Sequence, residues 1–355
     1  MRFFCFLLLL IILALHWATP RTAAPLHLPP LAVVMTRNPK IGVHTRLTGM
    51  GDEAAFRQQF TAIREMGASW VVDLFPWAYV QPRDPAVFDW RGADMLVAHA
   101  RQQGLQVIAR LDIVPAWARP HNTSDRLLLP AAYPAYARYV AAFATRYPDI
   151  QYLQIWNEPN LDLEWGGQTP DPEAYARLLQ TVYPVVKQAN PRALIVAGAL
   201  SPGPDVPQAR LDDLAYTRRV AQAGGQWDVW AVHAYGAKSP ALEPPHPDRI
   251  NFRRVEVYRE LLRALEKPSP LIVTEGGWND HPRWAGAVTP AQRLEWTVDA
   301  YHLARAWPDV VAVCLWQWQL PTTHSYQDNY SFVAPDGTPK ALYWAVQSYA
   351  LTDGD

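Results

Sequence analysis

The sequence is poor in cysteine, in charge and in clustered basic residues. Of its 355 residues two are cysteines, and only 18% are charged. Cys5 lies in an apolar N-terminal run, so the rest of the chain holds Cys314 alone, which excludes a disulfide framework and a cysteine-based metal site there. The formal net charge is −1 with both signs interspersed. The basic surface needed to bind nucleic acid or an anionic membrane is therefore missing.

Motifs for metals and nucleotide cofactors are also missing. No His-x-x-x-His pair and no cluster of aspartates stands at a predicted strand end. No glycine-rich turn follows the first predicted strand, which argues against a doubly wound dinucleotide-binding sheet. We therefore expect neither a metal nor a cofactor, and no nucleic-acid partner.

Residues 1–24 differ from the rest of the chain. Met1-Arg2 is followed by an almost unbroken apolar run from Phe3 to Leu15 and then by small residues up to Ala24. This order is typical of a secretory signal peptide, and the run is shorter than the roughly 20 residues of a comfortable membrane span. We expect a secreted or cell-envelope protein, with an uncleaved membrane anchor as the alternative. Residues 25–39 would then lead into one domain.

From residue 40 to residue 350 one pattern recurs about every 40 residues: a short apolar strand, a loop rich in Trp, Pro and Gly, and an amphipathic helical stretch. The predicted strands are Ile41–Thr45, Trp70–Phe75, Gln106–Leu111, Tyr152–Trp156, Leu194–Gly198, Val229–His233, Leu271–Thr274 and Val311–Trp316. The helical patterns are Asp52–Met66, Arg91–Gln103, Tyr133–Arg146, Pro172–Gln188, Leu211–Ala223, Asn251–Leu265 and Pro290–Ala306. Eight such units without a linker predict an α/β fold, a single (β/α)₈ TIM barrel.

Two glutamates stand where predicted strands give way to loops. Glu158 follows the fourth strand and Glu275 ends the seventh, 117 residues later, which is the length of three repeating units. The carboxyl ends of parallel barrel strands meet on one face, where such barrels hold their active sites. Two carboxylates that meet there are the minimum equipment for cleaving a glycosidic bond.

Other polar and aromatic residues gather at the same strand ends. Those that we expect to contact a substrate are Asn157, His233, Tyr235, Trp316, Trp77, Trp117, Trp278, Arg110 and His44. A core position is an equally good interpretation for Trp77, Trp117, Trp165 and Trp278. Asp73 and Asp112 are predicted to pair with Arg110 in the barrel mouth, and Glu164 is a weaker alternative to Glu158 as an acid.

The combination of motifs resembles the superfamily of retaining glycoside hydrolases on (β/α)₈ barrels, which includes cellulases, mannanases, β-xylosidases and β-galactosidases. The resemblance rests on Asn157-Glu158 after strand four, His233-Ala234-Tyr235 after strand six, Glu275 in strand seven and Trp316 in strand eight. It covers about residues 40 to 350. One departure is Val72 in strand two, where many members carry an arginine that positions the nucleophile; Arg110 in strand three is our candidate to replace it.

The resemblance implies a role for each of these residues. Glu158 would be the general acid/base, Glu275 the nucleophile, and Tyr235 a hydrogen-bond donor to Glu275. Asn157 would hold the 2-hydroxyl of the sugar, and Trp316 would form the floor under it. His233 would orient the same network.

The implied activity is that of a retaining O-glycosidase whose partner is a carbohydrate, with the two carboxyl groups about 5–5.5 Å apart. A catalytically inactive glycan-binding barrel and a transglycosylase using the same site are the alternatives. The sequence carries no signal for the sugar, for exo or endo action, or for the oligomeric state.

Overall fold

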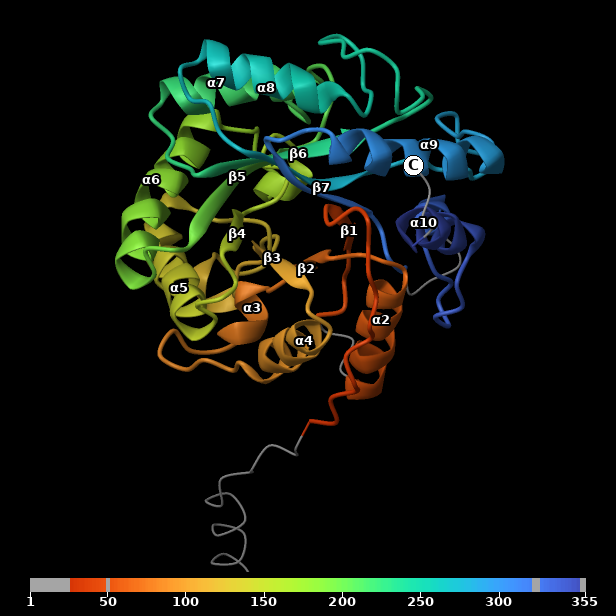
Figure 1. The fold of residues 1–355 in the computed structure, drawn as a ribbon. Coiled ribbons are helices and arrows are strands. Elements are labelled where there is room, and N and C mark those ends of the chain that lie inside the picture. The colour runs from red at the N-terminus through yellow and green to blue at the C-terminus, as the bar shows by residue number, and fades with distance from the viewer. Residues whose placement is uncertain (1–25, 49–51, 321–325, 352–355) are drawn as a thin grey trace, which may run out of the picture.

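The computed structural model describes residues 26–48, 52–320 and 326–351. Eight parallel strands close into a barrel in chain order, with β8 hydrogen-bonded to β1 and helices around the outside (Figure 1). This confirms the predicted (β/α)₈ architecture. The expected signal peptide or anchor at residues 1–24 lies outside the described residues and stays a prediction. Within the described residues, no helix combines the length and apolarity needed to cross a membrane.

The observed strands start close to the predicted positions and differ mainly in where they end. They are β1 (Ile41–His44), β2 (Trp70–Leu74), β3 (Gln106–Leu111), β4 (Tyr152–Ile155), β5 (Leu194–Leu200), β6 (Val229–Tyr235), β7 (Leu271–Gly277) and β8 (Val310–Trp316). Strand β7 continues three residues beyond its predicted end. Glu275 is therefore part of the hydrogen-bonded barrel wall rather than of a loop, and it pairs with His233 of β6.

The helices cover the outside of the barrel. They are α2 (Glu53–Glu65), α3 (Trp77–Val80), α4 (Arg91–Gln102), α5 (Tyr133–Arg146), α6 (Pro172–Ala189), α7 (Asp213–Gln222), α8 (Arg254–Ala264), α9 (Pro290–Arg305) and α10 (Ala341–Leu351). Side-chain caps from Asp52, Asp171, Asp212 and Thr289 accept hydrogen bonds from first-turn N–H groups. Each such cap contributes about 1 kcal/mol. The sequence had not indicated α3 or α10 as separate helices.

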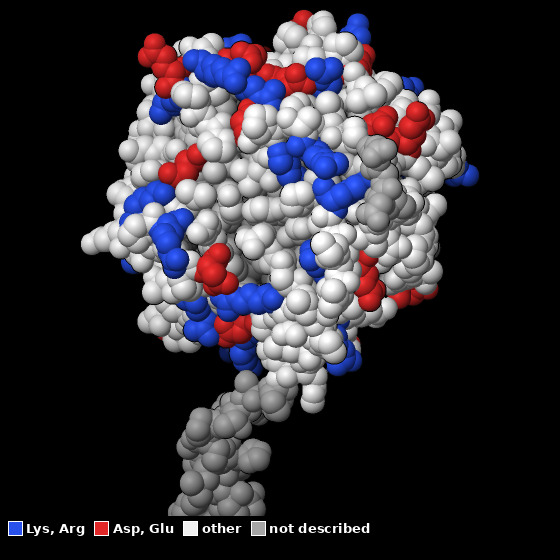
Figure 2. All heavy atoms as spheres, viewed as in Figure 1, with Lys and Arg blue, Asp and Glu red and all other residues white. Residues whose placement is uncertain are grey.

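The interior of the barrel is filled by small and branched side chains. They form a cluster of their own, separate from the larger core between sheet and helices, and include Val72, Ile108, Val196, Ala231, Ile272 and Cys314. Cys314 packs against Gly42, where a Cβ atom would lie only 2.5 Å from its sulfur. Cys314 is thus a buried packing residue, as predicted. Because this apolar cluster fills the interior of the barrel, polar groups are concentrated at the ends of the strands. On the face shown in Figure 2, charges of both signs are interspersed.

Candidate active site

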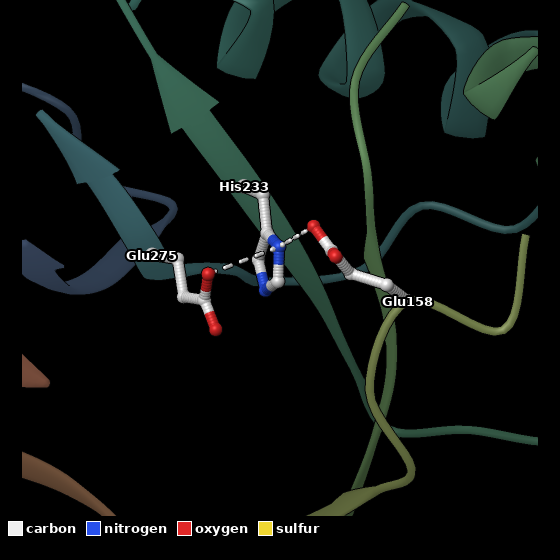
Figure 3. A group of neighbouring side chains, drawn as sticks. All are labelled: Glu158, His233 and Glu275. Carbon is white, nitrogen blue, oxygen red and sulfur yellow. Dashed lines mark hydrogen bonds and ion pairs between the residues drawn. The ribbon is translucent and has the colours of Figure 1, made fainter. Parts of the chain in front are cut away.

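Glu158 and Glu275 converge on the imidazole of His233. The Nδ1 atom of His233 lies 2.9 Å from Oε1 of Glu158 and 3.7 Å from Oε2 of Glu275 (Figure 3). One carboxylate oxygen of each glutamate and one ring nitrogen of His233 all lie within 4.8 Å of one another. The two carboxyl groups, distant in sequence, therefore face one small volume at the carboxyl end of the barrel.

An unusual backbone conformation brings Glu158 to this point. Both Trp156 and Glu158 have positive φ angles, 70° and 39°, which non-glycine residues adopt only when the surrounding structure holds them there. The N–H of Glu158 donates to the Ala199 carbonyl at 2.8 Å, and its own carbonyl accepts from Leu161 N–H. The indole of Trp156 is buried and donates to the Glu164 carbonyl at 2.7 Å. The turn after β4 is therefore fixed from both sides.

A register shift in the β6–β7 ladder sets the position of Glu275. The shift falls between Val232 and His233, after which His233 and Glu275 are direct register partners. Such irregularities redirect side chains at barrel rims. Here both side chains reach the site from neighbouring strands. Tyr235, two residues further along β6, is in register with Gly277, and its side chain reaches Glu275.

Glu275 lies in a strongly positive environment. Its Oε2 accepts a hydrogen bond from the Tyr235 hydroxyl at 2.8 Å, and its Oε1 lies 3.4 Å from Nη1 of Arg110. Burial alone would raise its pKa, but the charges of His233, His44 and Arg110, with the Tyr235 hydrogen bond, lower the pKa to about 2. Glu275 is consequently ionised at neutral pH, as a nucleophile requires.

His44 lies behind Glu275 rather than in the space in front of it. It is buried, and its Nδ1 atom is 3.0 Å from the Thr274 carbonyl and 3.6 Å from Oε1 of Glu275. Burial lowers the pKa of His44 to about 4, so the ring is neutral at pH 7 and donates its N–H to Thr274. The expected direct contact of His44 with a substrate is therefore corrected to support of the Glu275 strand.

The pKa of His233 is raised, whereas the pKa of Glu275 is lowered. Burial on its own lowers the pKa of His233, but the charge of Glu275 and the hydrogen bond to Glu158 outweigh burial and raise the pKa above its usual value. The Nδ1 atom lies 2.9 Å from Oε1 of Glu158, so a ring that carries the Nδ1 hydrogen donates it to this carboxylate. His233 thus links the two carboxylates and orients the Glu158 side chain.

A network of residues with alternating charge lies beside Glu275 and begins with Arg110 on strand β3. Arg110 Nε donates to Oδ2 of Asp112 at 2.7 Å, and Arg126 Nη1 donates to the same oxygen at 2.7 Å. Arg126 also lies 3.0 Å from Glu164. The predicted pair of Arg110 and Asp112 is confirmed. Asp112 thus holds the Arg110 guanidinium beside Glu275. Strand β2, which carries Val72, offers no arginine for this contact.

Asp73 takes no part in this network, which corrects the expectation that it pairs with Arg110. Its carboxylate accepts hydrogen bonds from Thr45 at 2.6 Å, from the Leu47 N–H at 3.1 Å and from the Thr48 hydroxyl at 3.0 Å. Asp73 therefore fixes the loop after β1.

The site opens into a cavity of about 610 Å³. Its lining includes the expected residues Asn157, Glu158, Tyr235, Glu275, Arg110 and Trp316. The Oδ1 atom of Asn157 is buried and has no hydrogen-bond partner among the described residues. Glu164 also lines the cavity, and burial raises its pKa, with Glu158 and Asp112 acting in the same direction against Arg126 and Arg110.

Three predicted tryptophans do not reach this cavity. Trp77 is 0% exposed, stacks on Tyr139 and donates its indole N–H to Gln81. Trp117 packs edge-on against Trp77 and donates to the Gln81 carbonyl. The loops after β2 and β3 therefore turn these rings outward, into the layer between barrel and helices, and the expectation that Trp77 and Trp117 bind substrate is corrected.

Trp278 is corrected in the same way. It is 2% exposed and donates its indole N–H to the Ser239 carbonyl at 2.8 Å. The ring crosses Gly236, where a Cβ atom would lie 1.9 Å from the indole nitrogen. It therefore pins the loop after β6 to the loop after β7. Trp165, for which the sequence favours neither cavity wall nor core, is buried as well.

Other residues line the cavity without having been expected there. They are three aromatic residues and three arginines: Trp284, Tyr326, Tyr330, Arg46, Arg126 and Arg210. Trp284 stacks obliquely near Tyr326, with ring centroids 5.4 Å apart, and Tyr330 lies edge-on to Trp316 at 5.3 Å. All six belong to loops or to segments beyond strand ends. Strand periodicity, which located the glutamates, says nothing about them.

Among the described residues, Glu158, His233 and Glu275 form the group with the spacing of metal ligands. The donor set fits an acid/base pair better than an ion. Tyr235 already donates to Glu275, and the Arg110 guanidinium lies beside the same carboxylate. A divalent cation would sit against that positive charge.

Solved structures share this fold. A family 39 glycoside hydrolase from Bacteroides cellulosilyticus WH2 superposes with a TM-score of 0.69 at 21% identity, covering 90% of this chain and 65% of its own. A monomeric β-xylosidase from Caulobacter crescentus CB15 gives 0.65 at 21% identity, covering 90% and 69%. A psychrophilic family 10 endo-β-1,4-xylanase gives 0.56 at 14% identity, covering 90% and 97%.

The chain therefore spans just under two thirds of the length of the first of these proteins. No protein-family model matches the sequence, and no curated protein matches it significantly. At these identities the likeness concerns the fold. The fold is that of (β/α)₈ glycoside hydrolases from more than one family, which bears out the resemblance seen in the motifs at the level of architecture.

Proposed function

We propose that this protein is a retaining glycoside hydrolase that cleaves β-O-glycosidic bonds of oligo- or polysaccharides. The observation that carries the proposal is the convergence of Glu158 and Glu275, with one oxygen of each within 4.8 Å. Retaining enzymes hold their carboxyl groups about 5–5.5 Å apart, whereas inverting enzymes need at least about 6.5 Å to admit a water molecule. The approach of these two oxygens is compatible with the retaining arrangement, in which one carboxylate attacks directly.

In the first step the Glu275 carboxylate attacks the anomeric carbon. The bond between that carbon and the leaving oxygen breaks, and Glu158 gives its proton to the leaving oxygen. The low pKa of Glu275 keeps it ionised for this attack. Arg110 and Tyr235 hold its two oxygens in place, which limits the rotation that would misalign it.

In the second step Glu158 acts as a base. It takes a proton from water, whose oxygen attacks the anomeric carbon and releases Glu275. The hydrogen bond from His233 fixes the Glu158 oxygen in both steps. Asn157, whose side-chain oxygen is free of described partners, would bind the sugar 2-hydroxyl, and Trp316 would stack beneath the ring.

Covalent trapping tests this assignment. A panel of 2-deoxy-2-fluoro glycosides with good leaving groups is incubated with the protein, and peptide mass spectrometry locates the label. We expect the sugar on Glu275. A Glu275→Gln variant should remain unlabelled, and a Glu158→Gln variant should recover turnover of activated aryl glycosides when azide is added. Labelling elsewhere would remove Glu275 from its role.

The same experiment separates the alternatives. A glycan-binding barrel without activity would bind the fluorosugar but form no covalent bond. A transglycosylase would form the same intermediate and pass the sugar to an added acceptor, which product chromatography detects.

A further inference from the structure

Two arginines of the cavity remain outside the charge network around Glu275. Arg110 and Arg126 are both tied to Asp112. Arg46 and Arg210 line the same cavity, and neither forms an ion pair with a carboxylate anywhere in residues 26–48, 52–320 and 326–351. A guanidinium without a carboxylate partner at the wall of a cavity is available to an anionic group of a ligand.

The position of Arg210 is well defined. Its backbone N–H donates to the Val206 carbonyl at 2.9 Å, and Arg210 forms an isolated bridge with Leu161, three residues after Glu158. Its Nε donates to the Pro204 carbonyl at 2.9 Å. The guanidinium rests against Gly203, where a Cβ atom would lie 3.1 Å from both Cζ and Nη2. The loop thus holds the side chain and leaves its terminal nitrogens for another partner.

The charges around the cavity are unbalanced when the first catalytic step begins. Glu158 must then be protonated, so the three carboxylates of Asp112, Glu164 and Glu275 face four guanidinium groups, those of Arg46, Arg110, Arg126 and Arg210. A positive cavity attracts anionic ligands and disfavours cationic ones.

We propose that the substrate is an anionic glycan whose carboxylate or sulfate group is bound by Arg210. This inference rests on the proposed glycosidase function. The neighbours of Arg210 in the chain are hydrogen-bonded to the segment that follows Glu158, Ala209 to Asp162 and Leu211 to Asn160, and Glu158 protonates the leaving oxygen. The anionic sugar therefore lies on the leaving-group side of the scissile bond. Carboxylate and sulfate share the acceptor geometry that a guanidinium fork recognises.

Binding measurements with the full chain test the proposal. The Glu275→Gln variant is used because it blocks turnover. Calorimetric titration then measures its binding of xylo-oligosaccharides, cello-oligosaccharides and glycosaminoglycan backbones. Each backbone is compared in a neutral, a uronic-acid-bearing and a sulfated version. We expect at least one anionic series to bind about 10-fold more tightly than its neutral counterpart, as a charge-assisted hydrogen bond implies. This preference should shrink as salt increases. The carboxylated and sulfated arms identify the anion.

Two arginine substitutions in the same background complete the test. Arg210→Gln should abolish the preference, whereas Arg218→Gln, exposed on α7 away from the cavity, should keep it. Circular dichroism and melting curves establish that each variant is folded. Equal or tighter binding of the neutral series, no binding of any anionic glycan, or a preference unchanged by Arg210→Gln overturns the proposal.

The fluorosugar experiment distinguishes a failure of this inference from a failure of the proposed function. Labelled Glu275 without an anionic preference defeats the inference and leaves the glycosidase assignment intact. An Arg210-dependent preference without labelling of Glu275 supports the binding site and defeats the catalytic assignment.

Discussion

Arg110 reaches Glu275 from strand β3, with Nη1 of the guanidinium 3.4 Å from Oε1 of the carboxylate. The same guanidinium is held by Asp112 at 2.7 Å. Both side chains of this contact are buried, so the charge of Arg110 acts on Glu275 with little screening by water. An arginine on a neighbouring strand thus performs the positioning for which strand β2, with Val72, has no residue.

Replacing Arg110 with glutamine should lower both stability and activity. Removing one partner of a buried ion pair costs about 3–5 kcal/mol, and the lost charge-assisted contact should reduce kcat by roughly 10- to 100-fold. Urea unfolding and steady-state kinetics measure the two effects. Arg101→Gln, which breaks an exposed pair with Asp149, is the control and should cost about 1 kcal/mol at most. Equal effects of the two substitutions would contradict the role of Arg110.

Tyr235→Phe isolates a single hydrogen bond to Glu275. The fold should survive, and kcat/KM should fall by roughly 10- to 100-fold because a bond to a charged group is lost. Tyr301→Phe is a matched control, since the Tyr301 hydroxyl donates to the Gly42 carbonyl inside the wall, remote from the cavity. It should lower the free energy of unfolding by about 1 kcal/mol and leave kcat/KM unchanged. Kinetics in which both variants lose activity alike would argue against the Tyr235 assignment.

Trp316 and Trp77 should respond to alanine in opposite ways. Trp316 lines the cavity and is half-buried, so Trp316→Ala should raise KM or lower kcat with a modest loss of stability. Trp77 is fully buried in the outer core, so Trp77→Ala should cost about 3–5 kcal/mol of unfolding free energy. Kinetics at a temperature where both variants are folded make the comparison. Impaired catalysis without loss of stability in Trp77→Ala would restore it as a substrate contact.

The low pKa of Glu275 makes stability depend on pH in a defined window. Folding lowers this pKa from 4.5 to about 2, so the ionised carboxylate stabilises the fold above about pH 4.5. That contribution declines below pH 4.5 and is lost as the pH falls through 2. Unfolding free energies between pH 6 and pH 3 should therefore fall more steeply for the wild type than for Glu275→Gln. Parallel curves would show that Glu275 does not carry this linkage.

The sequence located those residues whose positions follow from strand periodicity. Glu158, Glu275, Asn157, Tyr235 and Trp316 all follow from the end of a predicted strand, and all five line the cavity. Register alone places such residues on the catalytic face of a barrel.

Loop residues were harder to place from the sequence. The direction of Trp77 and Trp278 depends on how their loops pack against Tyr139 and across Gly236, which are contacts between distant segments. Arg126 and Arg210 reach the cavity through hydrogen bonds and bridges of loops that have no repeating pattern. The positive φ of Glu158 likewise depends on Ala199.

The configuration of the first-formed product tests the central claim most directly. Proton NMR can follow the anomeric signals during cleavage of a β-linked substrate identified in the trapping panel, before mutarotation mixes them. Glu275 attacks from one face, and water then attacks from the opposite face, which the leaving group has vacated; the two inversions predict that the β anomer appears first. Initial release of the α anomer would mean a single inversion, and Glu275 would then not act as a nucleophile.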